Sequence, residues 1–329
     1  MPDNLISDVV LEDVACPNGC SKHDEQLFTA HDRLHNLPGE YCVVRCCACG
    51  LIRTNPRPAP EAIGFYYPDD YGPYLGSQTT RGNEGFKRVL RNVYRAIFPN
   101  NSQVLPPLPP GRLLEVGCAS GAFMVEMAAK GWCVEGIEFS DSAAASARAN
   151  GLSVHTGSVE SAPDYTELFD LVIGWMVVEH LHDPVGALSK LARWTKPGGW
   201  LAISVPNAGS SEFLLFKGAG YALHIPNHLY HFSPETLSTL LEKSGWKVAR
   251  VFHQRTLANW MGGMGYKLDD WGAPSWLSKP FKNYPGAPGL LTLLLFPLAW
   301  LFSLFGQTGR MTVWAQRKDD VCNRIGKLE

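Results

Sequence analysis

Short apolar runs and helical segments alternate along the chain from Gly111 onwards. The runs typical of buried strands are Arg112–Val116, Cys133–Glu138, Phe169–Gly174, Trp200–Val205 and Lys247–Phe252. The segments typical of helices are Ser120–Lys130, Ser142–Asn150, Pro184–Thr195 and one that starts with Ser233 as its cap and ends at Gly245. Strands that alternate with helices predict an α/β fold with a parallel sheet and helices on both faces.

Breaks in this pattern predict four parts of the chain. Residues 1–60 are rich in cysteine and end in a Pro-rich run, which is typical of a small separate module. Residues 61–110 are expected to form a linker and helical segment, with a helix over Phe86–Phe98 and a breaker at 104–110. Residues 111–318 carry the alternating pattern, with an apolar insert over 254–309, and residues 319–329 form a tail.

Composition limits the class of protein. The chain has 329 residues, of which 45% are hydrophobic and 18% charged, and this excludes a disordered chain. The formal net charge of -2 argues against a protein whose main role is to coat nucleic acid. The acidic N-terminus has no apolar core of a secretory signal, so we expect a cytoplasmic protein with reduced cysteines.

The cysteines gather near the N-terminus, where six of the nine lie within the first 50 residues. In a reducing compartment such a cluster indicates metal binding or catalysis rather than disulfides. Cys46-x-x-Cys49-Gly50 is typical of a metal-binding turn, and Cys16-x3-Cys20 supplies a second pair of thiolates, so the four predict a closed, structural Zn²⁺ site. A reduced loop without metal is the alternative. Three spare donors leave the choice of ligands open: Cys42, Cys47 and His23.

A turn of small residues lies between the first predicted strand and the first predicted helix. Its sequence, Glu115-Val116-Gly117-Cys118-Ala119-Ser120-Gly121, lets the backbone approach a ligand at the start of a helix. Glu115 would repel a pyrophosphate, whereas Glu138 at the end of the second strand suits two ribose hydroxyls. The turn therefore favours a nucleoside that carries an ammonium group, and a Rossmann-like domain that binds NAD or no ligand is the alternative.

These stretches resemble a known family. Glu115–Gly121 and Gly136-Ile137-Glu138-Phe139-Ser140 look like motifs I and II of the class I S-adenosylmethionine-dependent methyltransferases. Phe169–Val172 with Val178–Pro184 resembles the fourth strand of that family and the element after it, and Lys196–Leu201 resembles its turn before strand five. The resemblance covers about residues 111–253. It implies a Rossmann-like seven-stranded sheet, closed by an antiparallel strand for which Arg310–Arg317 is suited.

The N-terminal part extends the resemblance to a bacterial subfamily. Its members carry a zinc-ribbon-like module before the methyltransferase domain and modify sugars, polysaccharide precursors and other small metabolites. The residues similar to this subfamily are the Cys46–Leu51 turn, Asn55-Pro56-Arg57-Pro58 and Phe65-Tyr66-Tyr67 with Tyr71.

The resemblance implies roles for individual residues in binding S-adenosyl-L-methionine. Four would line its methionine part: Glu115, Gly117, Cys118 and Gly121. Glu138 would hold the ribose and Phe139 would lie near the adenine, while Ser158 and Val159 would meet the adenine edge. Trp175 and Met176, at the end of the fourth strand, would face the reacting centre.

Two histidines are candidates for the general base that a hydroxyl acceptor requires, namely His180 and His228. For each of them a structural role is the alternative, and for His182 and His231 we favour the structural role. Tyr67 and Tyr71 either close over the acceptor or pack the module onto the domain. Glu179-His180 resembles part of a divalent-ion site in ubiquinone-type O-methyltransferases, but Met176 stands where those enzymes have a further Glu, so we expect no metal there.

The apolar insert contains a segment without a polar face. No charged residue occurs from Asn283 to Gln307, and apolar residues occur all round a helix drawn over 288–306. A single membrane crossing would separate the last strand from its sheet. The segment is therefore expected to contact a membrane peripherally, which would place the protein at the inner face of the membrane, or to form a buried hairpin or a homodimer interface.

The leading hypothesis is an enzyme that transfers a methyl group from S-adenosylmethionine, by in-line displacement, to a small-molecule, sugar or lipid-linked acceptor. O-methylation is the first choice, and C- or N-methylation stays open. An RNA base methyltransferase with a zinc module is a second hypothesis, against which the net charge argues. A non-catalytic scaffold that binds the cofactor is the third.

Overall fold

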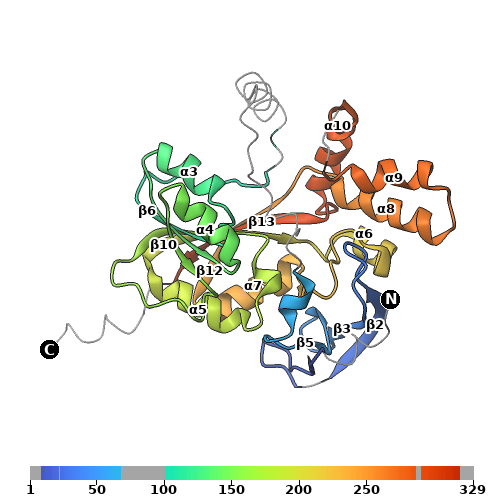
Figure 1. The fold of residues 1–329 in the computed structure, drawn as a ribbon, viewed down its shortest axis with the longest axis horizontal. Coiled ribbons are helices and arrows are strands. Elements are labelled where there is room, and N and C mark those ends of the chain that lie inside the picture. The colour runs from blue at the N-terminus through green and yellow to red at the C-terminus, as the bar shows by residue number, and fades with distance from the viewer. Residues whose placement is uncertain (1–8, 22, 68–98, 100, 287–289, 319–329) are drawn as a thin grey trace.

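A seven-stranded sheet forms the centre of the protein in the computed structural model, which describes residues 9–21, 23–67, 99, 101–286 and 290–318 (Figure 1). The order of its strands is β12-β13-β10-β9-β6-β7-β8. Their bounds are β6 (Arg112–Val116), β7 (Cys133–Glu138), β8 (Ser153–Thr156), β9 (Phe169–Trp175), β10 (Thr195–Pro206), β12 (Trp246–His253) and β13 (Arg310–Arg317).

The direction of the strands agrees with the expected fold. The neighbours β6, β7, β8, β9 and β10 pair in parallel, whereas β13 pairs antiparallel with both β10 and β12. The register places Val313 of β13 opposite Ile203 of β10 and Val251 of β12. The prediction of a Rossmann-like sheet closed by one antiparallel strand is thus confirmed.

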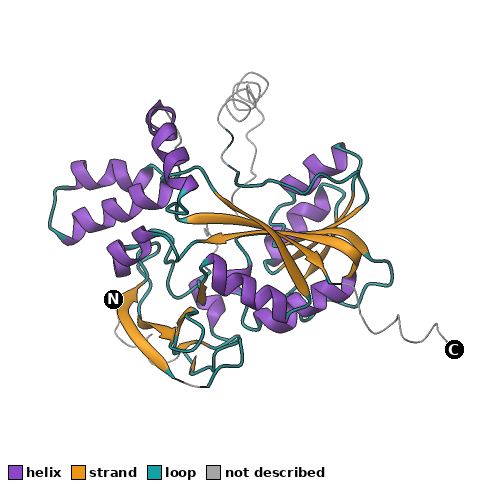
Figure 2. Cartoon of the chain, turned by 180° about the vertical axis from the view of Figure 1, so that it is seen from behind, coloured by secondary structure: helices purple, strands orange, loops and turns teal. Residues whose placement is uncertain are grey.

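Helices cover both faces of this sheet, with α3 and α4 on one side and α5 and α7 on the other (Figures 1 and 2). Their bounds are α3 (Ala122–Ala129), α4 (Asp141–Ala149), α5 (Pro184–Trp194) and α7 (Pro234–Lys243). Ser233 caps α7 as expected, because its side chain accepts a hydrogen bond from the backbone N–H of Thr236. The first helix begins at Ala122 rather than Ser120, because Gly121 before it is in the left-handed region with a φ of 81°.

The core lies between the sheet and these helices. Leu113, Leu114, Val172 and Ile203 of the central strands are at most 2% exposed. Strands that bury both faces have no polar side to alternate with, which is why they stand out in the sequence as continuous apolar runs.

A smaller sheet of four strands lies at the N-terminus, with the order β11-β4-β3-β2. Its strands are β2 (Asp24–His31), β3 (Glu40–Cys46), β4 (Ile52–Thr54) and β11 (Tyr230–His231). The short strand β11 comes from the other half of the chain and pairs antiparallel with β4. The N-terminal part also contains a two-stranded ribbon, formed by β1 (Leu11–Glu12) and β5 (Arg57–Pro58). The 3₁₀ helix η2 (Ile63–Tyr66) comes after β5.

The described residues of the apolar insert form three helices between β12 and β13. They are α8 (Ala258–Asp270), α9 (Ser275–Asn283) and α10 (Leu290–Leu304). The first two pack side by side, and α10 projects beyond them on the side away from the N-terminal sheet (Figures 1 and 2). Among the described residues there is no helix with both the length and the apolar character needed to cross a membrane.

Three shorter helical turns connect the larger elements: η3 (Val178–His180), α6 (Ser211–Phe216) and η4 (Lys217–Ala219). The expected helix over Phe86–Phe98, Tyr71 and the tail over 319–329 lie outside the described residues.

Candidate functional site

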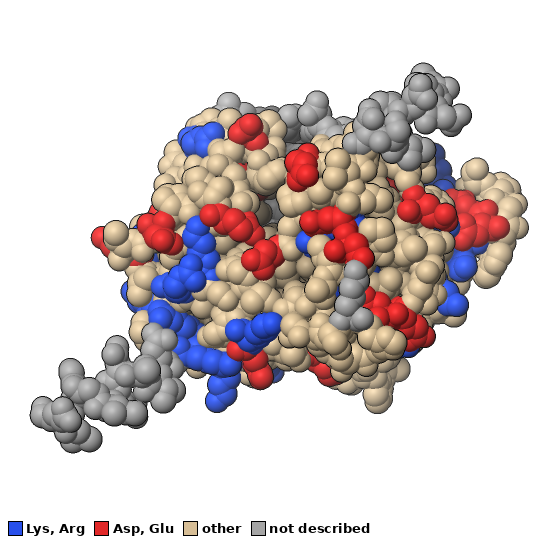
Figure 3. Space-filling view, turned by 90° about the horizontal axis from the view of Figure 1, so that it is seen from below, with Lys and Arg blue, Asp and Glu red and all other residues tan. Residues whose placement is uncertain are grey.

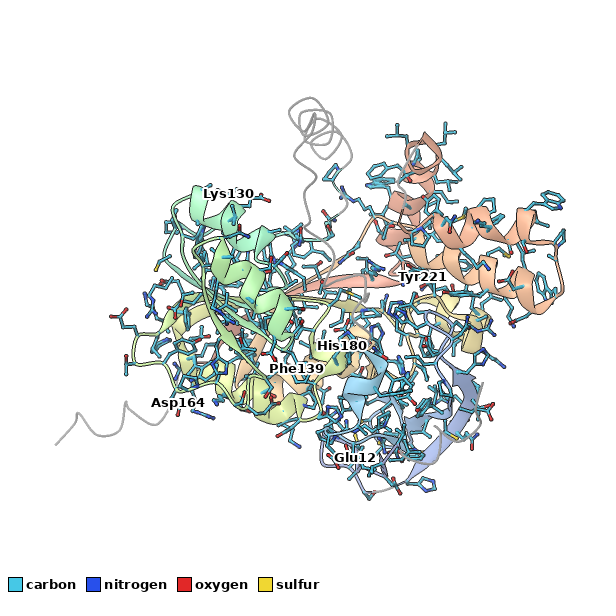
Figure 4. All side chains as sticks on the ribbon, viewed as in Figure 1. Glu12, Lys130, Phe139, Asp164, His180 and Tyr221 are labelled. Atoms are coloured by element: carbon cyan, nitrogen blue, oxygen red, sulfur yellow. The ribbon has the colours of Figure 1, made fainter. Side chains whose placement is uncertain are left out.

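A cavity of about 500 Å³ opens at the carboxyl ends of the parallel strands. Gly117 after β6, Glu138 at the end of β7 and Val177 after β9 line it together. Ligands bind at this edge in open α/β sheets because loops from neighbouring strands diverge there. Phe139 and His180 lie near the junction of the large sheet and the N-terminal sheet (Figure 4).

The turn after β6 keeps its backbone against the neighbouring strand. The backbone N–H of Gly117 donates to the carbonyl oxygen of Ile137 at 2.8 Å. Gly117 has a φ of 69°, and a Cβ there would lie 2.6 Å from Cγ2 of Val177. Only glycine fits this position without strain, so the cavity floor is made of bare backbone.

Glu138 is fixed by two backbone donors. Its Oε2 accepts from the N–H of Ala119 and its Oε1 from the N–H of Ser140, both at 2.8 Å. Burial raises the pKa of Glu138 above its ordinary value, and these N–H donors act in the opposite direction. Each carboxylate oxygen keeps a further lone pair, so the side chain has the acceptor capacity that two vicinal hydroxyls require.

The predicted cofactor residues divide into two sets. Those that line the cavity are Gly117, Glu138, Phe139, Ser158 and Val159. Phe139 is 59% exposed, so a broad aromatic surface is available at the cavity. The residues that do not line it are Glu115, Cys118, Gly121, Trp175 and Met176.

Three residues of the second set have other surroundings. Glu115 is 3% exposed, and burial together with the charge of Glu138 raises its pKa to about 8. The ring of Trp175 packs edge-on against Phe123 at 5.7 Å. A Cβ at Gly121 would lie 2.2 Å from Cδ1 of Leu152, so this glycine allows α3 to pack closely against the segment after α4.

His180 lines the cavity, and two oxygen atoms lie close to its Nδ1. Its Nδ1 lies 3.0 Å from the main-chain oxygen of Asn227, which can only accept a hydrogen bond. We assign the proton to Nδ1 on this ground, and Oη of Tyr67, 2.8 Å from the same atom, then also accepts from it. Burial lowers the pKa of His180 to about 4, so the imidazole is neutral near pH 7, with its Nε2 lone pair available.

His228 lies behind His180, at an edge-on ring distance of 4.6 Å, and does not line the cavity. Its Nδ1 donates to the carbonyl oxygen of Ala222 at 2.8 Å. Burial holds its pKa well below the ordinary value, and the neighbouring histidines act in the same direction. His182 and His231 have other partners, since Nε2 of His182 lies 3.1 Å from the oxygen of Pro58 and Nε2 of His231 lies 3.4 Å from Oγ1 of Thr54.

The N-terminal part forms one wall of the cavity through Pro60, Ile63 and Tyr67. Tyr67 is among the residues expected at the acceptor from the sequence, whereas Pro60 and Ile63 are not. No signal in the sequence marks these two, because their role depends on how the N-terminal sheet packs against the loop after β9. Val177, Leu181, His182 and Asp183 of that loop complete this side.

Glu179 is fully buried, and neither of its carboxylate oxygens has a hydrogen-bond partner among the described residues. Burial raises its pKa to about 8. One ligand atom of each of Glu179, His180 and His228 lies within 4.8 Å of the others. His228 thus supplies a third candidate ligand beside Glu179 and His180, whereas the expectation of no metal rests on Met176 and stays a prediction.

The four cysteines predicted to bind zinc come together. The four Sγ atoms, of Cys16, Cys20, Cys46 and Cys49, all lie within 4.8 Å of one another. The distance from Sγ of Cys16 to Sγ of Cys49 is 3.5 Å. Tetrahedral Zn²⁺ with Zn–S bonds of about 2.3 Å separates its sulfur ligands by about 3.8 Å, so the cluster fits the ion. The spare donors Cys42, Cys47 and His23 are outside this group.

The pKa values of these thiols are shifted in both directions. Burial alone would raise the pKa of Cys49, but hydrogen bonds to Asn18, to the backbone of Leu51 and to neighbouring thiols lower it to about 7. Burial raises the pKa of Cys20 to about 11. A cation would favour the thiolate form of every member of the cluster.

Comparison with known proteins gives matches over the middle of the chain. Residues 89–251 match the family described as methyltransferase domain. The ubiquinone biosynthesis O-methyltransferase of Thiobacillus denitrificans is 37% identical over 128 residues, which cover 36% of this chain and 55% of that protein. The enzyme of the same name from Paracidovorax citrulli is 36% identical over 128 residues, which cover 36% of this chain and 54% of that protein. The chain thus spans about half the length of these curated relatives.

Among solved structures, an S-adenosylmethionine-dependent methyltransferase from Mesorhizobium loti is similar with a TM-score of 0.43 and 15% identity. The similarity covers 69% of this chain and 96% of that one.

Proposed function

We propose, from the match of residues 89–251 to the methyltransferase-domain family, that this chain transfers the methyl group of S-adenosylmethionine to a hydroxyl group of a small-molecule acceptor. The single observation that carries the proposal is one cavity lined by both Glu138 and His180. Glu138 is suited to bind a ribose, and His180 is suited to act as a proton acceptor.

The cofactor, when bound, supplies an electrophilic methyl group on a sulfonium. The protein then has to bind the nucleoside, orient the acceptor and remove a proton from it. Glu138 would accept hydrogen bonds from the ribose hydroxyls, Phe139 would lie against the adenine, and the backbone at Gly117 would allow close approach of the methionine part. Val159 and Ser158 would contact the adenine edge.

We assign the role of general base to His180 rather than to His228. His180 lines the cavity, carries its proton on Nδ1 and is neutral near pH 7, so its Nε2 can accept a proton from a hydroxyl. His228 is 2% exposed and holds the ring of His180 from behind. It is a positioning residue in this scheme.

The acceptor would be bound between the loop after β9 and the wall made by Pro60, Ile63 and Tyr67. This wall combines aliphatic and aromatic surface with one phenolic hydroxyl, which suits an acceptor with an apolar part and a few polar groups. The relatives named O-methyltransferases support oxygen as the methylated atom. Sugars and lipid-linked intermediates remain within this class of acceptor.

We further propose that the four clustered cysteines hold a structural zinc ion that supports this wall. The thiolates must stay reduced to bind zinc, so we place the protein in the cytoplasm. On the face drawn in Figure 3, both acidic and basic side chains occur, and this pattern does not favour a nucleic-acid acceptor.

A transfer experiment tests the function. Protein and cofactor with a labelled methyl group are incubated with cell extract separated into lipid, glycan, RNA and small-metabolite pools. Label is expected in the small-metabolite, glycan or lipid pool, and His180→Ala is expected to abolish the transfer. Label in RNA alone would contradict the acceptor class, and tight cofactor binding without transfer into any pool would support a non-catalytic scaffold instead.

A further inference from the structure

One surface of the protein takes no part in the proposed reaction and is apolar. Leu291, Leu294, Leu298 and Leu301 of α10 form a stripe and are between 41% and 68% exposed. Phe305, directly after the helix, continues the stripe and is 71% exposed. No charged residue occurs anywhere in α10.

The exposed region is wider than this stripe. Trp300 and Leu304 are 43% and 59% exposed, and at 100° per residue they extend the exposed region to about half of the helix circumference. The other half packs on the protein, where Ala299 and Ser303 are buried. We call the exposed half the apolar face of α10. A helix that pairs with one other helix needs a narrower stripe, whereas a face this wide suits a planar apolar phase.

The α8–α9 turn, by which we mean residues 271–276 including the start of α9, presents two further aromatic side chains. Trp271 and Trp276 are 70% and 76% exposed. Tryptophan is favoured where apolar chains meet polar headgroups, because its ring is apolar and its N–H is a hydrogen-bond donor. Both ends of the insert also return to the same sheet, since Val251 of β12 pairs with Val313 of β13. The insert can therefore lie on a surface without separating the last strand from its neighbours.

The charge of this region indicates the kind of surface. No Asp or Glu occurs between Trp271 and Arg310, whereas Lys279 and Lys282 do. The two acids at the end of α8 are neutralised, because Asp269 pairs with Lys282 and Asp270 pairs with Arg33 at 2.9 Å. Lys279 is exposed and makes no ion pair within the described part of the chain. The uncompensated charge is positive and would be attracted to anionic headgroups.

We propose that the apolar face of α10 and the α8–α9 turn form a docking surface for an anionic lipid bilayer. The helix lies parallel to the bilayer, its exposed half among the headgroups and the first carbons of the acyl chains, and Lys279 contacts lipid phosphate. This inference is independent of the proposed reaction, because it uses no residue of the cavity.

Flotation of the full chain with vesicles tests the proposal. The vesicles are phosphatidylcholine alone or phosphatidylcholine mixed with phosphatidylglycerol. We expect the protein to float with the mixed vesicles. The triple variant Leu294→Ser, Leu301→Ser and Phe305→Ser should bind about a hundredfold more weakly, because three apolar side chains no longer leave water. Val125→Ser, which changes a 48% exposed side chain on α3, is the matched control and should bind like the wild type.

The contribution of charge is measured separately with Lys279→Gln. This variant should bind mixed vesicles about fivefold more weakly and phosphatidylcholine vesicles unchanged. Brominated lipid should quench the tryptophan fluorescence of Trp300→Phe less than that of the wild type. Such a difference would place the apolar face of α10 at the bilayer independently of the triple variant.

Two results would overturn the proposal. The first is flotation of the triple variant to the same extent as the wild type while its thermal unfolding is unchanged. The second is a wild type that stays in solution with both kinds of vesicle and sediments as a dimer, with the triple variant sedimenting as a monomer. In that case the apolar face would be an interface between two copies of the chain.

Discussion

The main-chain oxygen of Asn227 lies 3.0 Å from Nδ1 of His180, while the amide Nδ2 of the same Asn227 donates to the main-chain oxygen of Tyr66 at 2.8 Å. One residue thus holds the proposed base with its backbone and the N-terminal wall of the cavity with its side chain. The position of the N-terminal part is thereby coupled to the orientation of the imidazole.

Removing the side chain of Asn227 should lower turnover but leave cofactor binding almost unchanged. Asn227→Ala leaves the buried oxygen of Tyr66 without its donor, so we expect a loss of about 1–3 kcal/mol in the free energy of unfolding. Turnover should fall because His180 and Tyr67 are no longer aligned, while the dissociation constant of the cofactor should hardly change. Kinetics and calorimetry measure both, and the exposed Asn150→Ala is the control. A weaker affinity for the cofactor with normal turnover would contradict the coupling.

The two histidine candidates should differ in the kind of defect they cause. His180→Gln removes the proton acceptor and should lower turnover by about 10²–10⁴-fold with little effect on cofactor affinity. His228→Gln should have a smaller effect, because it only loosens the ring of His180.

The pH profile distinguishes a base from a merely structural histidine. Burial lowers the pKa of His180 to about 4, so the rate of the wild type should be level above that pH and fall below it as the imidazole gains its proton. The residual rate of His180→Gln should lack this acid limb. An identical acid limb in wild type and variant would exclude His180 as the base.

Glu138 should control cofactor affinity. Glu138→Gln keeps the shape of the side chain but replaces one acceptor oxygen with an NH₂ that faces backbone N–H donors, so binding should weaken by at least about tenfold. Glu160→Gln is a matched control, because Glu160 also lines the cavity but is exposed. Equal dissociation constants of the cofactor for the two variants would show that Glu138 does not bind the ribose.

Elemental analysis of the purified protein should find one zinc ion per chain, bound by the cysteine cluster. Cys46→Ser should lose the metal and lower the melting temperature, whereas Cys47→Ser, the exposed neighbour, should keep both. Turnover should also fall in Cys46→Ser, because β4 lies next to the cluster and the N–H of Thr54 holds the oxygen of Leu229 at 3.0 Å. A full zinc content in Cys46→Ser would show that other ligands are used. Glu179→Gln should leave the zinc content unchanged.

The stability of the protein should depend on Glu179 between about pH 4.5 and 8. Burial raises its pKa from 4.5 to about 8 in the folded state. A raised folded-state pKa means that the stabilisation is complete below about pH 4.5 and is lost as the pH rises towards 8. Between pH 5.5 and 8, the wild type should therefore lose up to about 3 kcal/mol more than Glu179→Gln in the free energy of unfolding. Denaturant unfolding at both pH values measures this, and parallel losses would argue against a neutral Glu179.

The buried sheet could be predicted from the sequence more fully than the N-terminal part. The bounds of β6, β7 and β13 agree with the expected ones to the residue. In β6 all residues but the first are buried, so the strand stands out from its surroundings in the sequence. By contrast, β2 has mixed side chains and only one buried residue, so its pattern carries little signal. The strand β11 has two residues and owes its existence to pairing with β4.

The site shows the same division. Gly117 and Glu138 follow consecutive strands of one motif, so their meeting at one sheet edge could be expected from chain order. The approach of Tyr67 to His180 joins residues 113 positions apart and depends on the packing of two sheets. Glu115 and Met176 lie beside residues of the cavity in sequence, but they do not line it in the fold.

The pairing of β11 with β4 has a consequence for synthesis on the ribosome. Strand β4 ends at Thr54, and its partner begins 176 positions later at Tyr230. At about 5–20 residues per second, the outer edge of β4 waits roughly 10 to 35 seconds for its neighbour to be translated. During that interval an open strand edge is exposed to other nascent chains, and zinc captured early by the cysteines is the factor that would hold the unfinished sheet together.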